Sequence, residues 1–166
     1  MATESWSALL SRAMADEREL FRRFADEEAG LTRVVQERDW PALERSLADL
    51  ERLAGAIGDA EQRRHEHYQE LKQQLGVGDR AGFAVVAARL PEPERAALTA
   101  CHEQLRVAVG RVRTLTASLA YYFRYIKESI EQILVEAFPH RRGRIYSRAG
   151  RPAEAGAGPV VVNHSL

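Results

Sequence analysis

The sequence has only one cysteine, Cys101, among its 166 residues, so no disulfide bond can form within the chain. Chains without disulfides are typical of reducing compartments such as the cytosol. No stretch approaches the roughly 18 consecutive apolar residues that a transmembrane helix needs. The first residues also lack the basic and apolar regions of a secretory signal. These absences predict a cytoplasmic protein without a membrane span.

An excess of charge of either sign is also missing. Lysine and arginine together number 24, as do aspartate and glutamate, whereas a dedicated nucleic-acid-binding domain is normally basic. The charge is nevertheless unevenly distributed. Residues 139–166 contain five arginines and one glutamate, a net charge of +4, which leaves residues 1–138 at −4. We therefore predict an acidic body, residues 1–138, followed by a flexible basic tail, residues 139–166.

Catalytic and metal-binding signatures are absent as well. The sequence has no phosphate-binding loop, no dinucleotide fingerprint and no hydrolase elbow. His65 and His67 are two residues apart, which turns them about 200° from each other on a helix, so they cannot share a metal ion. Cys101 and His102 are adjacent, about 100° apart, which favours packing over a reactive pair. We predict that the protein is not an enzyme and uses no cofactor or metal.

Proline is scarce before residue 139, and it occurs where helices are expected to begin or end. Asp39 and Pro41 suit the N-cap and first turn of a new helix, Gly76 suits a helix end, and Pro91 closes a short connector. Between these breaks, apolar residues recur at alternating steps of 3 and 4. The sequence predicts an all-α fold of three long antiparallel helices in an elongated coiled-coil-like bundle. Their expected bounds are about 4–38, 40–75 and 93–138, with a short helix at 79–90 capped by Asp79.

Each long helix has a predicted seam of core-facing residues with heptad spacing. The seam of the first helix contains Trp6, Leu10, Ala13, Glu17, Leu20, Phe24, Glu27, Leu31 and Val34. The seam of the second contains Leu43, Leu47, Leu50, Ala54, Ile57, Glu61, Arg64, Tyr68, Leu71 and Leu75. The third helix has a broader apolar face than a two-stranded seam needs.

The third helix is longer than the hairpin formed by the first two. At 1.5 Å per residue it extends roughly 70 Å, against roughly 50 Å for each of the others, so its last turns are expected to overhang. Four aromatic residues at positions 121, 122, 123 and 125 point all around this helix, so at least one must leave the core face. An apolar face without an intramolecular partner is usually a binding site. The predicted binding residues are Leu119, Tyr122, Phe123, Ile126, Ile130, Ile133 and Leu134.

Two stretches resemble the FlgN family of flagellar export chaperones. Residues 34–53, VVQERDWPALERSLADLERL, resemble the first helical hairpin of that family, and a long third helix follows in the same place. The end of the chain, AFPHRRGRIYSRAGRP…PVVVNHSL, resembles the family's tail. That tail has a tyrosine with a glycine four residues later, here Tyr146 and Gly150, and a short apolar terminus.

The resemblance implies a cytosolic, non-enzymatic chaperone of flagellar type III secretion. Such a chaperone binds the C-terminal helical segments of the hook-associated junction proteins FlgK and FlgL and prevents their premature assembly. It then delivers them to the export gate protein FlhA. In this family the C-terminal helix binds the substrate protein and the tail tyrosine contacts the gate. If these roles apply to this chain, the resemblance implies that the apolar face of the third helix binds substrate. It likewise implies that Tyr146 and Gly150 dock on the gate.

Other interpretations of the sequence stay open. The arginine-rich tail also suits a structural coiled-coil adaptor, or a protein that binds nucleic acid through that tail, although Tyr146 is the only aromatic residue interleaved with the arginines. The arginines could equally be a solvated segment without a role. An unfilled apolar face could be covered by a second copy, so the sequence leaves a homodimer open.

Overall fold

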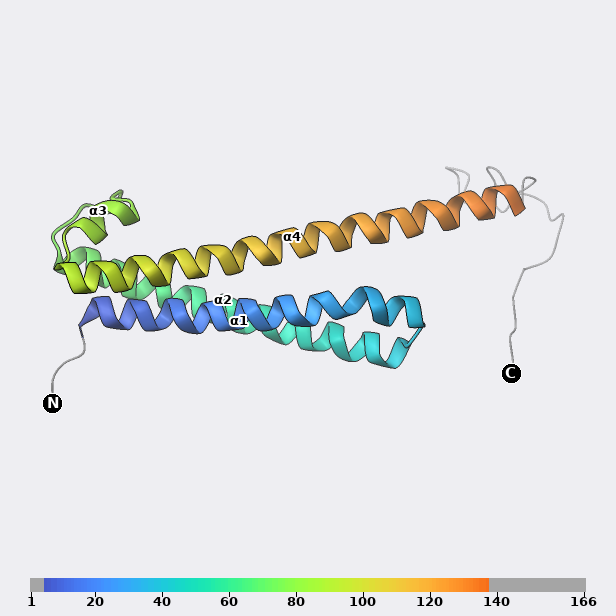
Figure 1. Ribbon diagram of the computed structural model, residues 1–166, viewed down its shortest axis with the longest axis horizontal. Helices are drawn as coiled ribbons and strands as arrows, with labels where there is room; N and C mark the ends of the chain where they lie inside the picture. The colour runs from blue at the N-terminus through green and yellow to red at the C-terminus, as the bar shows by residue number, and fades with distance from the viewer. Residues whose placement is uncertain (1–4, 138–166) are drawn as a thin grey trace, which may run out of the picture. The chain divides into compact units, whose positions relative to one another are not determined.

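The computed structural model describes residues 5–137, and all regular secondary structure within them is helical. Four helices follow one another: α1 (Trp6–Glu37), α2 (Trp40–Gln74), α3 (Phe83–Ala88) and α4 (Glu92–Ala137) (Figure 1). The predicted all-α fold class is thereby confirmed. The chain divides into two compact units after Tyr121. The first unit contains α1, α2, α3 and α4 as far as Tyr121, and the second contains the rest of α4.

Helices α1 and α2 form a hairpin within the first unit and lie side by side (Figure 1). Helix α1 ends at Arg38, which takes the left-handed conformation with φ 57°. The Asp39 carboxylate then accepts a hydrogen bond of 3.0 Å from the backbone N–H of Ala42, and Pro41 lies in the first turn of α2. The predicted cap is therefore correct. It satisfies a backbone donor that the first turn would otherwise leave without a partner.

Side-chain contacts fix the directions of the helices in the first unit. The Arg64 guanidinium of α2 lies 2.5 Å from the Glu17 carboxylate of α1. Helices α1 and α4 are joined at three levels, by Ser7 with Glu94, Arg18 with Gln104 and Asp26 with Arg111. Because the partners rise in number together along both helices, α4 runs in the same direction as α1, whereas the hairpin turn makes α2 run in the opposite direction.

The apolar core of the first unit gathers where α3 packs on the long helices. It consists of Leu10, Met14, Leu71, Val86, Leu90, Leu98 and Leu105. Four of these side chains, one or more from every helix, have at most 1% of their surface exposed. Burial of a leucine-sized side chain contributes about 1.5–3 kcal/mol. This cluster therefore holds α3 and the first turns of α4 against the hairpin.

The predicted short helix is corrected by the structure. Helix α3 covers Phe83–Ala88 and not 79–90, and Gly82 stands at its N-cap without a side-chain hydrogen bond. Asp79 does not cap it, because the helix begins at Phe83, four residues later; the backbone carbonyl of Asp79 accepts a hydrogen bond from the buried Lys72 ammonium group. Residues 78–81 form a turn instead, closed by a hydrogen bond of 2.8 Å from Ala81 N–H to the Gly78 carbonyl.

The predicted heptad seams of α1 and α2 are also partly wrong. In α1, Glu27 was expected in the core but is only half-buried, and its neighbour Glu28 is buried instead. In α2, Ala54 was expected in the core but is exposed, and its neighbour Leu53 is buried instead. Leu47 is 51% exposed. In α1 the buried Ser7, Met14 and Glu28 are spaced by multiples of seven, as are Leu10, Glu17 and Leu31. The heptad spacing of α1 therefore holds, and one of its two rows lies one residue later than predicted.

Candidate functional site

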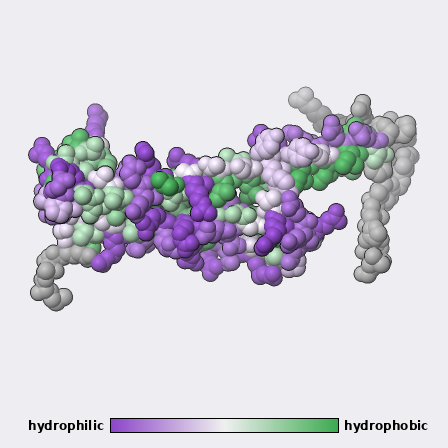
Figure 2. Space-filling view, viewed as in Figure 1, coloured by the Kyte–Doolittle hydropathy of each residue, from purple (hydrophilic) through white to green (hydrophobic). Residues whose placement is uncertain are grey.

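The predicted binding residues of the second unit form an exposed apolar face at the end of α4. Phe123, Ile130, Ile133 and Leu134 are 40–62% exposed, and Tyr122 and Ile126 are half-buried. Figure 2 shows hydrophobic side chains gathered along this end of α4. Leu119 is half-buried and belongs to the first unit. Large side chains exposed in a contiguous row are typical of surfaces that bind another molecule.

Helical spacing explains why these residues share one face. Tyr122, Ile126, Ile130 and Ile133 are separated by 4, 4 and 3 residues, which places them one above another on a helix. Phe123 and Leu134 flank this row. The rings of Tyr122 and Phe123 lie 5.8 Å apart at an angle of 55°, a tilted arrangement that aromatic pairs favour. We call the row with its two flanking residues the apolar face of α4.

Charged side chains border this face on one edge. Arg124, Lys127 and Glu131 lie there by helical position, and the Lys127 ammonium group is 3.7 Å from the Glu131 carboxylate. Both of these side chains are more than half exposed, so the pair contributes little to stability. The face therefore combines an apolar centre with a charged rim, as protein-binding surfaces do.

Aromatic residues outside the apolar face are exposed as well. Tyr121, at the end of the first unit, is 70% exposed, and Tyr125 in the second unit is 62% exposed. The prediction that at least one of the four clustered aromatics leaves the core is confirmed. Phenol rings combine an apolar body with a polar tip, which suits contact with a protein partner.

The histidines and Cys101 have packing contacts in the structure. The ring of His102 stacks on Phe83 with centroids 4.0 Å apart and an angle of 14°, which attaches α3 to α4. His67 lies beside Trp6, with ring centroids 5.9 Å apart, whereas His65 is exposed and Cys101 half-buried. Within residues 5–137, no group of three potential ligand residues is placed to hold a metal ion.

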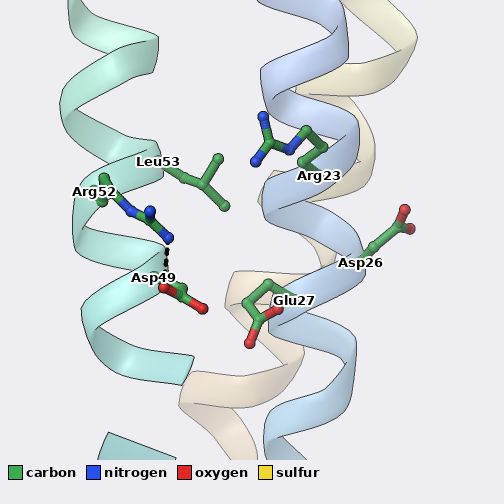
Figure 3. Close-up of a pocket in the computed structure, with 6 residues that line it drawn as sticks. All are labelled: Arg23, Asp26, Glu27, Asp49, Arg52 and Leu53. Carbon is green, nitrogen blue, oxygen red and sulfur yellow. Dashed lines mark hydrogen bonds and ion pairs between the residues drawn. The ribbon is translucent and has the colours of Figure 1, made fainter. Parts of the chain in front are cut away.

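A pocket of about 310 Å³ between α1 and α2 has a mostly charged lining. Figure 3 shows Arg52 paired with Asp49, at 2.5 Å, with Leu53 and Arg23 facing the space between the helices and Asp26 pointing away. The lining holds charges of both signs and a single apolar residue.

Two predicted site residues, Tyr146 and Gly150, lie outside the described residues. The same is true of the tail arginines. Among the helices that the structure describes, none is both long enough and apolar enough to cross a membrane.

Comparisons of the chain with protein-family models, with curated proteins and with solved structures find no match.

Proposed function

We propose that this protein is a cytoplasmic flagellar export chaperone of the FlgN type. Its substrates are the C-terminal helical segments of the hook-associated proteins FlgK and FlgL, which it keeps from assembling early and delivers to the export gate protein FlhA. One observation carries the proposal: α4 ends in an exposed apolar face, from Tyr122 to Leu134, with the spacing that receives another helix. The sequence resemblance supplies the identity of the partners.

Binding by this face follows from the burial of its side chains. A helix of the substrate protein would lie along the face and complete a coiled-coil-like bundle, a mode of recognition that uses anchors at helical spacing. Each leucine-sized anchor contributes about 1.5–3 kcal/mol when it is buried. Several anchors together offset the cost of ordering a partner segment that is unfolded when free. No catalytic group is required.

The apolar face is tested by placing charge within it. Ile126→Asp together with Ile130→Asp should abolish binding to purified FlgK and FlgL in a pull-down assay, because two buried carboxylates without partners oppose burial of the face. Helicity measured by circular dichroism should persist, since Ile130 is 52% exposed and Ile126 half-buried.

A matched control changes the opposite side of the same helix. Gln132→Asp together with Val135→Asp adds the same charge, at a position about half a turn from the face, and should leave binding intact. Equal capture of FlgK by the wild type and by the Ile126/Ile130 double variant would reject the proposed substrate site.

Docking on the gate is a separate step of the proposal, assigned to Tyr146 and Gly150. A lone tyrosine in a basic segment offers one large side chain to a partner. Tyr146→Ala should leave the affinity for FlgK unchanged and reduce secretion of FlgK and FlgL by living cells. Secretion at the wild-type level in that strain would reject the proposed gate contact of Tyr146, but it would not contradict the proposed substrate site on α4.

Binding of DNA or RNA by the arginine-rich tail is tested with the full-length wild-type protein. A gel-shift assay at about 0.15 M salt, where phosphate contacts are already weakened, should show no retained DNA or RNA. Retention of nucleic acid that disappears steeply with added salt would favour the adaptor interpretation over the chaperone.

A further inference from the structure

A second surface lies in the first unit, in a groove between α1 and α4. It is a cavity of about 260 Å³ whose lining is mainly apolar in area. Phe21 and Ala108 are half-buried in it, and Val107 is 70% exposed. Arg18, Arg22 and Arg111 surround these apolar side chains. We call this surface the arginine groove.

Hydrogen bonds between the helices close both ends of the arginine groove. At one end Arg18 donates to the side-chain oxygen of Gln104. At the other end Arg111 donates to Asp26 over 3.2 Å. These links hold α1 and α4 at a fixed separation over about two turns, so the groove between them is preformed. A preformed groove lowers the cost of ordering on binding.

The electrostatic character of the groove is positive. Three arginines and one acidic residue, Glu19, line it, although the whole chain has no net charge. The hydrogen bond from Arg22, together with the charges of Arg22, Arg23 and Arg18, lowers the pKa of the Glu19 carboxyl. Arg22 is already paired with Glu19 and Asp26, and Arg111 is paired with Asp26. An additional carboxylate would therefore meet Arg18, whose hydrogen-bond partner is the neutral amide of Gln104.

We infer that the arginine groove binds a partner segment in which an aliphatic side chain stands beside an acidic one. The aliphatic side chain would pack on Val107 and Phe21, and the carboxylate would accept hydrogen bonds from Arg18. The volume suits one or two side chains, since pockets for drug-sized ligands are generally larger, from about 300 Å³ upward. The protein's own tail is a poor occupant, because residues 139–166 carry a net charge of +4. This binding is independent of the proposed chaperone function and uses other residues.

The test uses the full-length chain and two fluorescein-labelled peptides, one of Asp-Leu-Leu-Glu repeats and the other with lysine at every acidic position. Fluorescence anisotropy should show binding of the acidic peptide only, weakened by added salt because exposed charges are screened. Arg18→Gln should weaken it about tenfold, the effect expected for one charge-assisted hydrogen bond. Val107→Asp should weaken it by at least as much, because it removes an apolar contact and adds a carboxylate that repels the acidic peptide. Val107 is largely exposed, so its replacement should leave helicity unchanged.

Two controls separate this groove from other surfaces. Arg106→Gln makes the same charge change on α4 outside the groove, where Arg106 pairs with Glu103, and should leave binding unchanged. The Ile126/Ile130 double variant disables the apolar face of α4 and should also retain the acidic peptide.

Any of four results would overturn the inference. The first is absence of binding at about 1 mM peptide, the limit of weak association. The second is equal affinity for the lysine peptide, and the third is a loss of affinity in Arg106→Gln equal to that in Arg18→Gln. The fourth is a wild-type dimer, measured by light scattering, that Val107→Asp converts into a monomer, since a second copy would then occupy the groove.

Discussion

Glu17 of α1 illustrates how a single charged residue is accommodated in the core. Its side chain is 4% exposed, and the Arg64 guanidinium, itself 26% exposed, lies 2.5 Å from its carboxylate. Removing a carboxylate of this kind from water is costly, and the nearby guanidinium offsets that cost. The pair also sets the register of α2 against α1, since either charge would lose its partner if the helices slipped by a turn.

Removal of the guanidinium should therefore destabilise the protein. Arg64→Ala leaves Glu17 buried without its partner and should lower the free energy of unfolding by about 2–3 kcal/mol. Urea denaturation followed by circular dichroism measures this. Arg52→Ala on the same helix, which breaks the exposed pair with Asp49, should cost less than about 0.5 kcal/mol. Equal stability of the two variants would contradict the structural role of the Glu17–Arg64 pair.

At the scale of single elements, α3 depends on few contacts for its position. Val86 is fully buried, whereas its neighbour Val85 is 51% exposed. Phe83 stacks on His102, and the Tyr68 hydroxyl donates to the Ala81 carbonyl over 3.3 Å. Burial also raises the pKa of the Tyr68 hydroxyl, a group that is protonated at neutral pH and able to donate. The connector is thus held by the buried Val86, Ala87 and Leu90, by one ring contact and by one hydrogen bond.

The two valines provide a matched test of this packing. Val86→Ala removes two buried methyl groups and should lower the free energy of unfolding by about 2 kcal/mol. It should also speed tryptic cleavage at Arg80 and Arg89, on either side of α3. Val85→Ala should change the free energy by less than about 0.5 kcal/mol. Faster cleavage in Val85→Ala than in Val86→Ala would show that α3 packs by its other face.

Local signals predicted the helices better than they predicted their contacts. Asp39 and Pro41 define the start of α2 through backbone chemistry within a few residues, so this boundary was predictable. Asp79 could not be excluded as a cap from sequence, because the start of α3 at Phe83 is set by the packing of Val86 and Leu90 in the core. Likewise, the burial of Glu28 and not Glu27 depends on how the other helices pack against α1, which local sequence does not show.

The two candidate surfaces also differ in how far local sequence could predict them. The apolar face of α4 was predictable because all its residues lie on one helix at regular spacing. The arginine groove was not, since Phe21 and Val107 are far apart in sequence and meet only when α1 and α4 pack together. Val107 is 70% exposed, and nothing in the sequence pattern indicates that it lines a groove with Phe21.

At the scale of the whole molecule, the chain combines an acidic helical body with a basic C-terminal segment. A chaperone of the proposed type requires two separate contacts, one for the substrate and one for the export gate. The apolar face of α4 and the residues around Tyr146 are separate segments of the chain and chemically distinct. In the proposed function, this separation would let substrate stay bound while the tail engages the gate.

The central claim is that the chain binds a helical segment of a junction protein through apolar burial. Isothermal titration calorimetry of the full-length protein with the C-terminal segment of FlgK tests it most directly. The account predicts a complex of one chain with one segment, a dissociation constant of about 1 μM or below, and a negative heat-capacity change, which marks buried apolar surface. An absence of binding heat at several temperatures, with the segment in about hundredfold excess over that constant, would contradict it.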